Sequence, residues 1–283
     1  MPECRLLLIS DLDGTLLGGD SRVSALSGAI ISDLTRRGAM ISVATARTPA
    51  TVEPLLSGIA TTPPAIVMTG CSLWERGERR FLNPHLFAPG LATRTAAEFV
   101  AYGVNPFVYT LTAAGRIIVY HNGGRLTRAE DNFYQERRGL ELKRFVFDTA
   151  EGYAAAFEGT MLLLGIGDTE SVGALATALQ RRPEISISAF PDIFNPRISY
   201  IEVFAEGVSK AQAVLDLKAL TGAERVVVYG DNLNDLSMMR VADESVAVAN
   251  ARPEVLEAAS RVIGPNTSDS VALDMASLFK GAR

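Results

Sequence analysis

Apolar and polar residues follow two different rhythms along the chain. In the first, short continuous apolar runs over Leu6–Asp11, Met40–Ala44 and Ala65–Met68 predict strands that are buried on both faces. Between them, Ser24–Arg37 and Pro49–Ser57 have the spacing and the end signals of helices. This alternation of strand and helix predicts an open α/β sheet with right-handed crossovers.

The rhythm changes after about Gly70. Two short segments, Phe107–Leu111 and Arg116–Tyr120, are joined by a turn-forming stretch and predict a hairpin. The other elements predicted in this part are helices over Leu91–Tyr102 and Glu170–Arg181 and strands over Thr160–Ile166 and Glu184–Phe190. Residues 83–196 are therefore expected to form an inserted α+β domain.

The first rhythm returns near the C-terminus. The elements predicted there are strands over Ile198–Phe204, Arg225–Tyr229 and Ser245–Ala249 and helices over Ser209–Leu220 and Leu233–Val241. The sequence thus predicts a Rossmann-like open parallel sheet built from two discontinuous halves, 1–82 and 197–283.

Composition narrows the class of protein. The 283 residues are 48% hydrophobic and 21% charged, as expected for a globular protein with a sizeable core. A formal net charge of -5 without basic runs argues against nucleic acid or an anionic membrane surface as a partner. The two cysteines suit a reducing compartment, and the apolar runs are too short for a signal peptide or a membrane span. A cytoplasmic location is therefore expected.

Polar residues gather where the predicted strands end. The four groups are Asp11 with Asp13, Thr45 with Arg47, Lys210 at a helix start, and Asp231, Asn234 and Asp235 in the run GDNLND. In an open α/β sheet, the active crevice lies outside the carboxyl ends of the strands. These groups are therefore the candidates for chemistry.

Asp11 and Asp13 follow directly after the run LLLIS, which is predicted to be buried. Aspartate and glycine are common in turns, so a solvated turn is the simplest explanation for this pair. Two carboxylates so close in sequence nevertheless repel each other unless a cation or a proton lies between them. A calcium loop is excluded, because glycine stands four positions into the loop rather than six and a strand precedes it.

The run GDNLND has more oxygen ligands than a helix start needs. One Asp or Asn suffices to cap a helix, whereas Asp231, Asn234 and Asp235 together suit a hard divalent cation. Thr45 and Lys210, each unremarkable alone, offer a hydroxyl and an ammonium group next to such a site. Groups of this kind at helix N-termini bind phosphate.

In this order along the chain, DLDGT, a threonine after the second strand, a lysine and GDNLND resemble the haloacid dehalogenase superfamily of phosphatases. The segments GVSKAQAV, GDNLNDLSMM and VAVANARPEV are similar to its Cof-type branch, which is related to sucrose-phosphate phosphatase. The resemblance covers both core halves. It implies that 83–196 is a large α/β cap that selects the substrate.

The resemblance also implies residue roles. Asp11 would be the nucleophile that forms an aspartyl-phosphate, and Asp13 the general acid and base. Thr45 and Lys210 would hold the phosphoryl oxygens. Mg²⁺ would be bound by Asp11, the main-chain carbonyl of Asp13 and Asp231, supported by Asp235 and Asn234. The expected partner is a small-molecule phosphate ester, most plausibly a sugar phosphate.

Some positions depart from the family pattern. The common Thr-Gly-Arg is Thr45-Ala46-Arg47 here, the common Asn-Gly is Thr69-Gly70, and Ala249 replaces a frequent glycine before Asn250. Ala46, Arg47 and Asn250 are candidate contacts for phosphate or substrate.

Two alternatives to a phosphatase remain at this point. A mutase or phosphotransferase would pass the same aspartyl-phosphate to a sugar hydroxyl. A binding module whose catalysis has lapsed would only hold the sugar phosphate.

Overall fold

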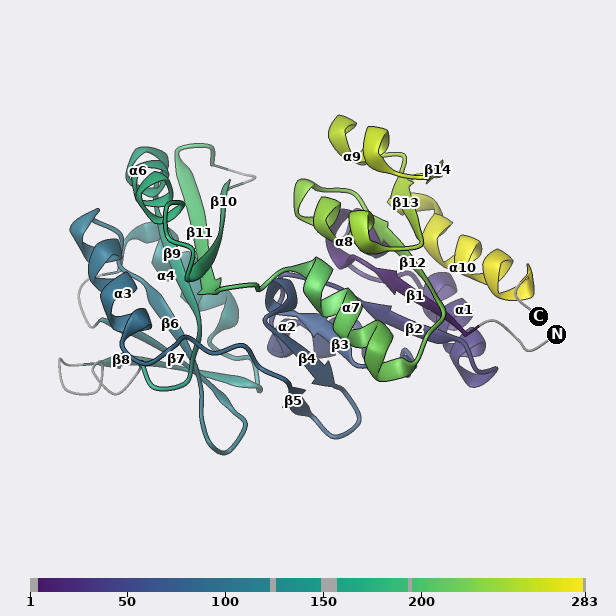
Figure 1. Cartoon of the computed structure of the whole chain (residues 1–283), viewed down its shortest axis with the longest axis horizontal. Coiled ribbons are helices and arrows are strands. Elements are labelled where there is room, and N and C mark those ends of the chain that lie inside the picture. The colour runs from purple at the N-terminus through teal and green to yellow at the C-terminus, as the bar shows by residue number, and fades with distance from the viewer. Residues whose placement is uncertain (1–4, 123–125, 149–156, 193–194, 282–283) are drawn as a thin grey trace. The chain divides into compact units, whose positions relative to one another are not determined.

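The computed structural model of the chain describes residues 5–122, 126–148, 157–192 and 195–281 (Figure 1). The backbone separates into two compact units. Unit 1 comprises Met1–Asn83 and Ser209–Arg283, and unit 2 comprises Pro84–Val208. Within the described ranges, no helix is both long enough and apolar enough to cross a membrane.

Unit 1 contains a five-stranded parallel sheet with the strand order β14-β13-β12-β1-β2. Its strands are β1 (Leu6–Ser10), β2 (Met40–Val43), β12 (Arg225–Gly230), β13 (Glu244–Val248) and β14 (Arg261–Ile263). Its helices are α1 (Ala25–Arg36), α2 (Pro49–Leu55), α7 (Lys210–Thr221), α8 (Leu236–Val241), α9 (Pro253–Ala258) and α10 (Ser270–Gly281). The predicted open parallel sheet is confirmed.

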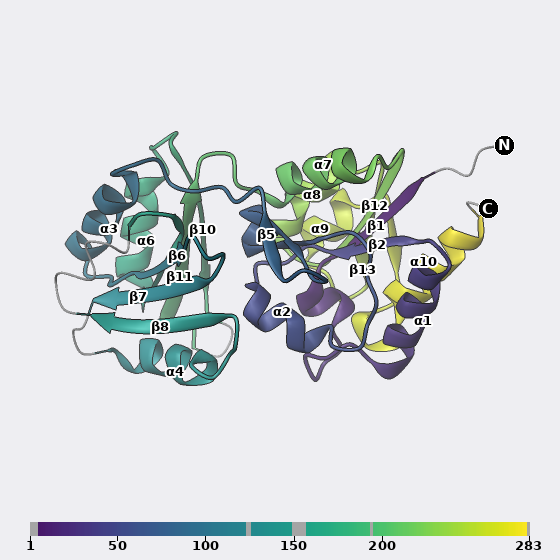
Figure 2. The ribbon, with the colours of Figure 1, turned by 90° about the horizontal axis from the view of Figure 1, so that it is seen from below.

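Helices cover both faces of this sheet. Figure 2 shows α7 and α8 on one side of β1 and β12, and α1 and α10 on the other. Every residue of β1 is buried, which explains the apolar run Leu6–Ile9 within it. The strand order turns around at β1, since β2 lies on one side of it and β12 on the other. Such a switch point is where ligands bind in open α/β sheets.

A small antiparallel sheet completes unit 1. It contains β3 (Ala65–Val67), β4 (Ser72–Glu75) and β5 (Arg80–Leu82), in that order. The chain passes from β3 to β4 through a tight turn, Met68–Gly70. This turn is part of the site described below.

Unit 2 is built on a six-stranded mixed sheet with the order β10-β11-β9-β6-β7-β8. Its strands are β6 (Phe107–Leu111), β7 (Ile117–Asn122), β8 (Lys143–Asp148), β9 (Thr160–Asp168), β10 (Ile185–Pro191) and β11 (Ile198–Ala205). Its helices include α3 (Leu91–Ala101), α4 (Arg128–Arg137) and α6 (Thr169–Leu179). The β6–β7 hairpin was expected from the sequence and is confirmed.

The two faces of the unit 2 sheet carry different cores. A mostly aliphatic cluster joins one face to α3 and α6, with Phe99 and Leu175 as buried members from the helices. On the other face, α4 packs on an aromatic cluster, and Phe133 lies 5.2 Å from Phe107 between ring centroids. The fully buried His121 belongs to this second cluster, with its ring 4.3 Å from that of Phe107.

The assignment of Ile198–Phe204 to the first unit is wrong. The segment forms most of β11, which pairs antiparallel with β10 on one side and with β9 on the other. The second unit therefore extends to Val208 rather than to residue 196. An eight-residue apolar strand satisfies either a parallel core sheet or the centre of a mixed sheet, so its pattern does not decide between them.

Lys143 at the start of β8 is buried against aromatic rings. Its ammonium group lies 5.8 Å from the ring centroid of Tyr109 and 5.5 Å from that of Phe145. Burial, together with the nearby charge of Arg137, lowers the pKa of Lys143 from 10.5 to about 7. The folded chain thus favours the neutral amine, and the unfolded chain binds more protons between these two pH values.

Stability should therefore rise with pH across that window, and Lys143→Met should remove the dependence. We expect the substitution to raise the free energy of unfolding by about 3 kcal/mol more near pH 6 than near pH 9. Calorimetric unfolding of the intact chain at both pH values measures this, with Lys280→Met at an exposed position as the control. Equal shifts at the two pH values would contradict the assignment.

Candidate active site

The site begins where β1 ends at the carboxyl edge of the sheet. Asp11 still pairs with β12 through its N–H, which donates to the carbonyl of Tyr229 at 2.9 Å. The chain then enters the turn Leu12–Leu16, where Gly14 has a φ of 78°. A Cβ at Gly14 would clash with the carboxylate of Asp231. Glycine is therefore required here both by conformation and by space.

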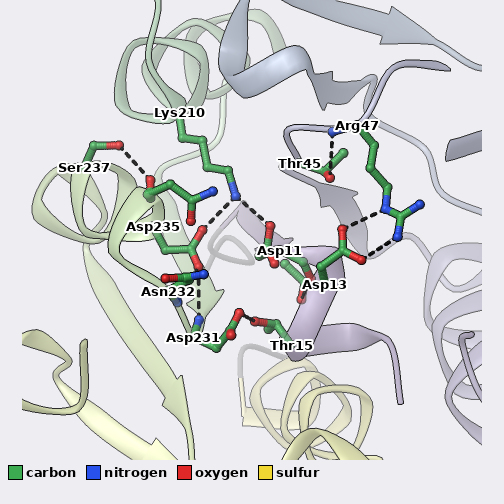
Figure 3. A network of polar contacts seen from close by, with 12 residues as sticks. Asp11, Asp13, Thr15, Thr45, Arg47, Lys210, Asp231, Asn232, Asp235 and Ser237 are labelled. Carbon is green, nitrogen blue, oxygen red and sulfur yellow. Dashed lines mark hydrogen bonds and ion pairs between the residues drawn. The ribbon is translucent and has the colours of Figure 1, made fainter. Parts of the chain in front are cut away.

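Lys210 joins two of the predicted acids. Its Nζ donates to Oδ1 of Asp11 at 2.6 Å and to Oδ1 of Asp235 at 2.7 Å (Figure 3). Lys210 is the first residue of α7, whose start is capped by the Ser209 hydroxyl. The lysine side chain is fully buried, and Asp235 is fully buried as well. A buried ammonium group of this kind is retained only with paired carboxylates.

Asp235 also organises the loop that carries Asp231. Its Oδ2 accepts hydrogen bonds from the main-chain N–H groups of Asp231 and Asn232, at 3.0 and 3.1 Å. Gly230 passes so close that a Cβ there would clash with the Asp235 side chain. Each oxygen of Asp235 thus accepts at least one hydrogen bond within the protein, and these contacts orient the loop that carries Asp231.

Thr15 was not singled out from the sequence, although it lies within DLDGT. Its hydroxyl donates to Oδ1 of Asp231 at 2.8 Å, so the first and the last acidic motifs are joined directly (Figure 3). The sequence feature that could have pointed to Thr15 is a small polar residue directly after the glycine of DLDGT. This feature does not reveal the hydrogen-bond partner, Asp231, which lies more than two hundred residues away in sequence.

The electrostatics of the cluster show excess negative charge. Burial, and then the neighbouring Asp235 and Asp231, raise the pKa of Asp11 to about 8 against the opposing effect of Lys210. Burial also raises the pKa of Asp231 to about 6, although Thr15 opposes it. Burial lowers the pKa of Lys210, but Asp11 and Asp235 outweigh it and the net shift is upward. One ammonium group does not neutralise three carboxylates.

This arrangement fits a divalent metal ion. Asp11, Asp231 and Asp235 each offer a carboxylate oxygen, and the three oxygens lie within 4.8 Å of one another. The donors are all hard oxygen atoms, as Mg²⁺ and similar cations prefer. The raised pKa values of Asp11 and Asp231 show that their ionised forms are disfavoured in this site, and a bound cation would stabilise them.

Thr45 follows β2, and its position beside Asp11 is fixed by the sheet. The preceding residue, Ala44, donates its N–H to the carbonyl of Ser10 at 2.8 Å. The Thr45 side chain is buried, and its Oγ1 accepts from the N–H of Arg47 at 3.1 Å. A threonine hydroxyl that accepts one hydrogen bond can still donate its own proton. Ala46 lies half-buried at the tip of this turn.

A strained turn braces the Thr45–Arg47 segment. Met68 and Thr69 have φ values of 51° and 59°, in the left-handed region that non-glycine residues rarely adopt. Their N–H groups donate to the carbonyls of Arg47 and Thr45, both at 3.0 Å. Next to them, Gly70 packs so tightly on Ser209 that a Cβ would clash with its carbonyl. The turn thus fixes the Thr45 loop and the start of α7 relative to each other.

Arg47 contacts Asp13. Its Nε donates to Oδ2 of Asp13 at 2.7 Å, and its Nη2 donates to Oδ1 at 2.5 Å (Figure 3). This bidentate pair raises the pKa of Arg47. Its expected contact with phosphate or substrate remains a prediction.

The two predicted asparagines differ in their contacts. Asn250 donates through Nδ2 to the carbonyl of Gly14 at 2.8 Å, and its Oδ1 accepts from the N–H of Asn266 at 2.9 Å. Through the nitrogen and the oxygen of its side-chain amide, Asn250 therefore connects the turn after β1 to Asn266. Asn234 has an exposed side chain, and its main-chain carbonyl accepts a hydrogen bond from the Ser237 hydroxyl.

Asp11, Thr45 and Lys210 thus lie together at the carboxyl edge of the parallel sheet, and comparison with known families shows to which class of protein this chain belongs. The chain matches the family of haloacid dehalogenase-like hydrolases over residues 8–275. It therefore belongs to that family, and the resemblance noted in the sequence is confirmed.

Known proteins of similar length agree with this membership. A putative phosphatase of Haemophilus influenzae is 24% identical over 279 residues, which are 96% of this chain and 97% of that protein. The 5-amino-6-(5-phospho-D-ribitylamino)uracil phosphatase of Bacillus subtilis is 25% identical over 274 residues, with 94% and 92% coverage. A solved haloacid dehalogenase-like hydrolase from Bacteroides thetaiotaomicron has the same fold, with a TM-score of 0.78, 19% identity and coverage of 97% and 99%. The chain is thus a phosphoric monoester hydrolase of the haloacid dehalogenase type.

Proposed function

We propose that this protein is an Mg²⁺-dependent phosphatase that hydrolyses a small sugar phosphate or a related polyol phosphate through an aspartyl-phosphate on Asp11. The observation that carries the proposal is the buried Asp11–Lys210–Asp235 cluster, in which Nζ lies 2.6 and 2.7 Å from the two carboxylates. It supports the proposal because the groups to which we assign these roles, Asp11 as nucleophile and Lys210 as the phosphate-binding cation, are in direct contact in one buried cluster.

In the first step, a carboxylate oxygen of Asp11 attacks phosphorus, and the bond to the ester oxygen breaks. Asp13 donates a proton to the departing oxygen. The Lys210 ammonium and the Thr45 hydroxyl offset the negative charge that spreads over the phosphoryl oxygens. The products of this step are the free alcohol and the aspartyl-phosphate.

In the second step, Asp13 takes a proton from a water molecule, which attacks the phosphorus of the aspartyl-phosphate. The bond between phosphorus and Asp11 breaks, and inorganic phosphate is released. A bound Mg²⁺, held by Asp11, Asp231 and the main-chain carbonyl of Asp13, would supply charge compensation for the phosphoryl group. Asp235 and Thr15 orient the ligands, as their hydrogen bonds to the loop and to Asp231 indicate.

The proposed substrate class rests on the supply of a general acid. Alkoxide ions are poor leaving groups, so a site with a positioned acid such as Asp13 suits esters of sugar and polyol hydroxyls. The ribityl phosphate in the name of the Bacillus subtilis relative supports the same class. We assign the choice among such substrates to unit 2.

Phosphate release from a panel of hexose, pentose, polyol and nucleotide monophosphates tests the proposal. We expect release with Mg²⁺, its loss in excess chelator and its return when Mg²⁺ is added back. Isomerised sugar phosphate without release would instead indicate a mutase. No metal-dependent reaction with any substrate would leave only a binding module and overturn the proposal.

A further inference from the structure

The Arg47 side chain holds the acid/base candidate Asp13. The Asp13 side chain is 53% exposed, yet both of its oxygens accept hydrogen bonds from the Arg47 guanidinium. An exposed aspartate samples several rotamers unless something restrains it. The planar fork of arginine restrains a carboxylate in both distance and orientation, which a lysine does not.

Arg47 is itself fixed to the frame of unit 1. Its N–H donates to Thr45 Oγ1, and its carbonyl accepts from the N–H of Met68. The Arg47 side chain is 30% exposed and therefore partly sheltered. Hydrogen bonds therefore connect the strained Met68–Thr69 turn to the Arg47 main chain and the Arg47 side chain to Asp13.

We infer that Arg47 is a positioning residue that holds Asp13 in the orientation for proton transfer, rather than a contact for the transferring phosphoryl group. The inference rests on the proposed function, because it assigns Arg47 to one proton-transfer group of that mechanism. The two donors on one edge of the guanidinium are already engaged by Asp13. Thr45 and Lys210 supply phosphate donors without Arg47.

Arg47 as a positioning residue for Asp13 and Arg47 as a phosphate contact predict different kinetics. A nitrophenolate ion leaves without a proton, so the first step with nitrophenyl phosphate does not need the acid Asp13. The second step needs Asp13 as base with every substrate, because water must be deprotonated. A positioning defect therefore spares the first step with the aryl ester and slows the second. A lost phosphate contact would slow both.

The experiment compares Arg47→Met with the wild type on nitrophenyl phosphate and on an alkyl phosphate, by rapid mixing and in the steady state. We expect the burst of nitrophenolate to keep its rate within about twofold, while the following steady-state rate falls about 10- to 100-fold. With the alkyl phosphate, the first step should fall by a similar factor. Arg47→Lys should recover only part of the loss, and Arg240→Met, at an exposed position on α8, serves as the control.

A double-mutant cycle with Asp13→Asn adds a second readout. If Arg47 acts through Asp13, removing Arg47 from the Asp13→Asn variant should cost little more in steady-state rate. A burst that slows as much as the steady state, or a raised KM with an unchanged kcat, would show a phosphate contact and overturn the inference. Unchanged rates would overturn it as well. A wild type that releases no nitrophenolate would instead contradict the proposed function.

Discussion

Asp11→Asn is expected to abolish phosphate release, with a loss of about 10⁴-fold or more in kcat for every substrate that the wild type accepts. The amide has the shape of the carboxylate but cannot form the aspartyl-phosphate. The loss should be independent of the leaving group, because no first step takes place. Steady-state phosphate release with a good and a poor leaving group measures it.

The same variant should remain folded, which separates loss of chemistry from loss of structure. Lys210 keeps its contact with Asp235 when Asp11 is replaced, so the ammonium group is not left unpaired. The control is Asp33→Asn on α1, a 52%-exposed carboxylate that should leave activity unchanged. Wild-type turnover in Asp11→Asn would mean that another group is the nucleophile.

Lys210→Met is expected to damage both stability and activity. The substitution leaves Asp11 and Asp235 buried side by side without their shared cation, at a cost of about 3–5 kcal/mol in the free energy of unfolding. It also removes a charge that stabilises the phosphoryl group, so kcat should fall by at least about 10²-fold in the protein that remains folded.

The single tryptophan makes the stability measurement specific to unit 1. Trp74 lies buried in β4, so its fluorescence during urea unfolding reports on the unit that holds the site. Lys218→Met on the same helix is the matched control. Its ion pair with Asp243 is partly exposed and should contribute less than about 1 kcal/mol. Similar unfolding free energies for the two variants would contradict the role assigned to the buried lysine.

Much of the fold could be predicted because the apolar pattern of a buried parallel strand is local. Leu6–Asp11 was predicted as a strand, and β1 ends at Ser10 with every residue buried. The prediction that Ile198–Phe204 belongs to the parallel sheet is wrong, because the sequence of a strand does not determine with which other strands it pairs. Its pairing with β9 and β10 depends on contacts far along the chain.

The site was predictable to the extent that strand ends determine it. Asp11, Lys210 and Asp235 come from three different segments, and the parallel sheet brings them together as that topology requires. The partners of individual side chains were not predictable. The Arg47–Asp13 pair and the Thr15–Asp231 hydrogen bond depend on turn geometry, which the sequence alone does not resolve.

Direct detection of the aspartyl-phosphate tests the central claim of a covalent mechanism. The wild-type chain, mixed with substrate and Mg²⁺ and quenched in acid during turnover, is digested and analysed by mass spectrometry. We predict one phosphoryl group on the peptide that contains Asp11, labile to hydroxylamine and absent from Asp11→Asn. Rapid turnover with no modified peptide, or with the phosphoryl group on another residue, would contradict the account.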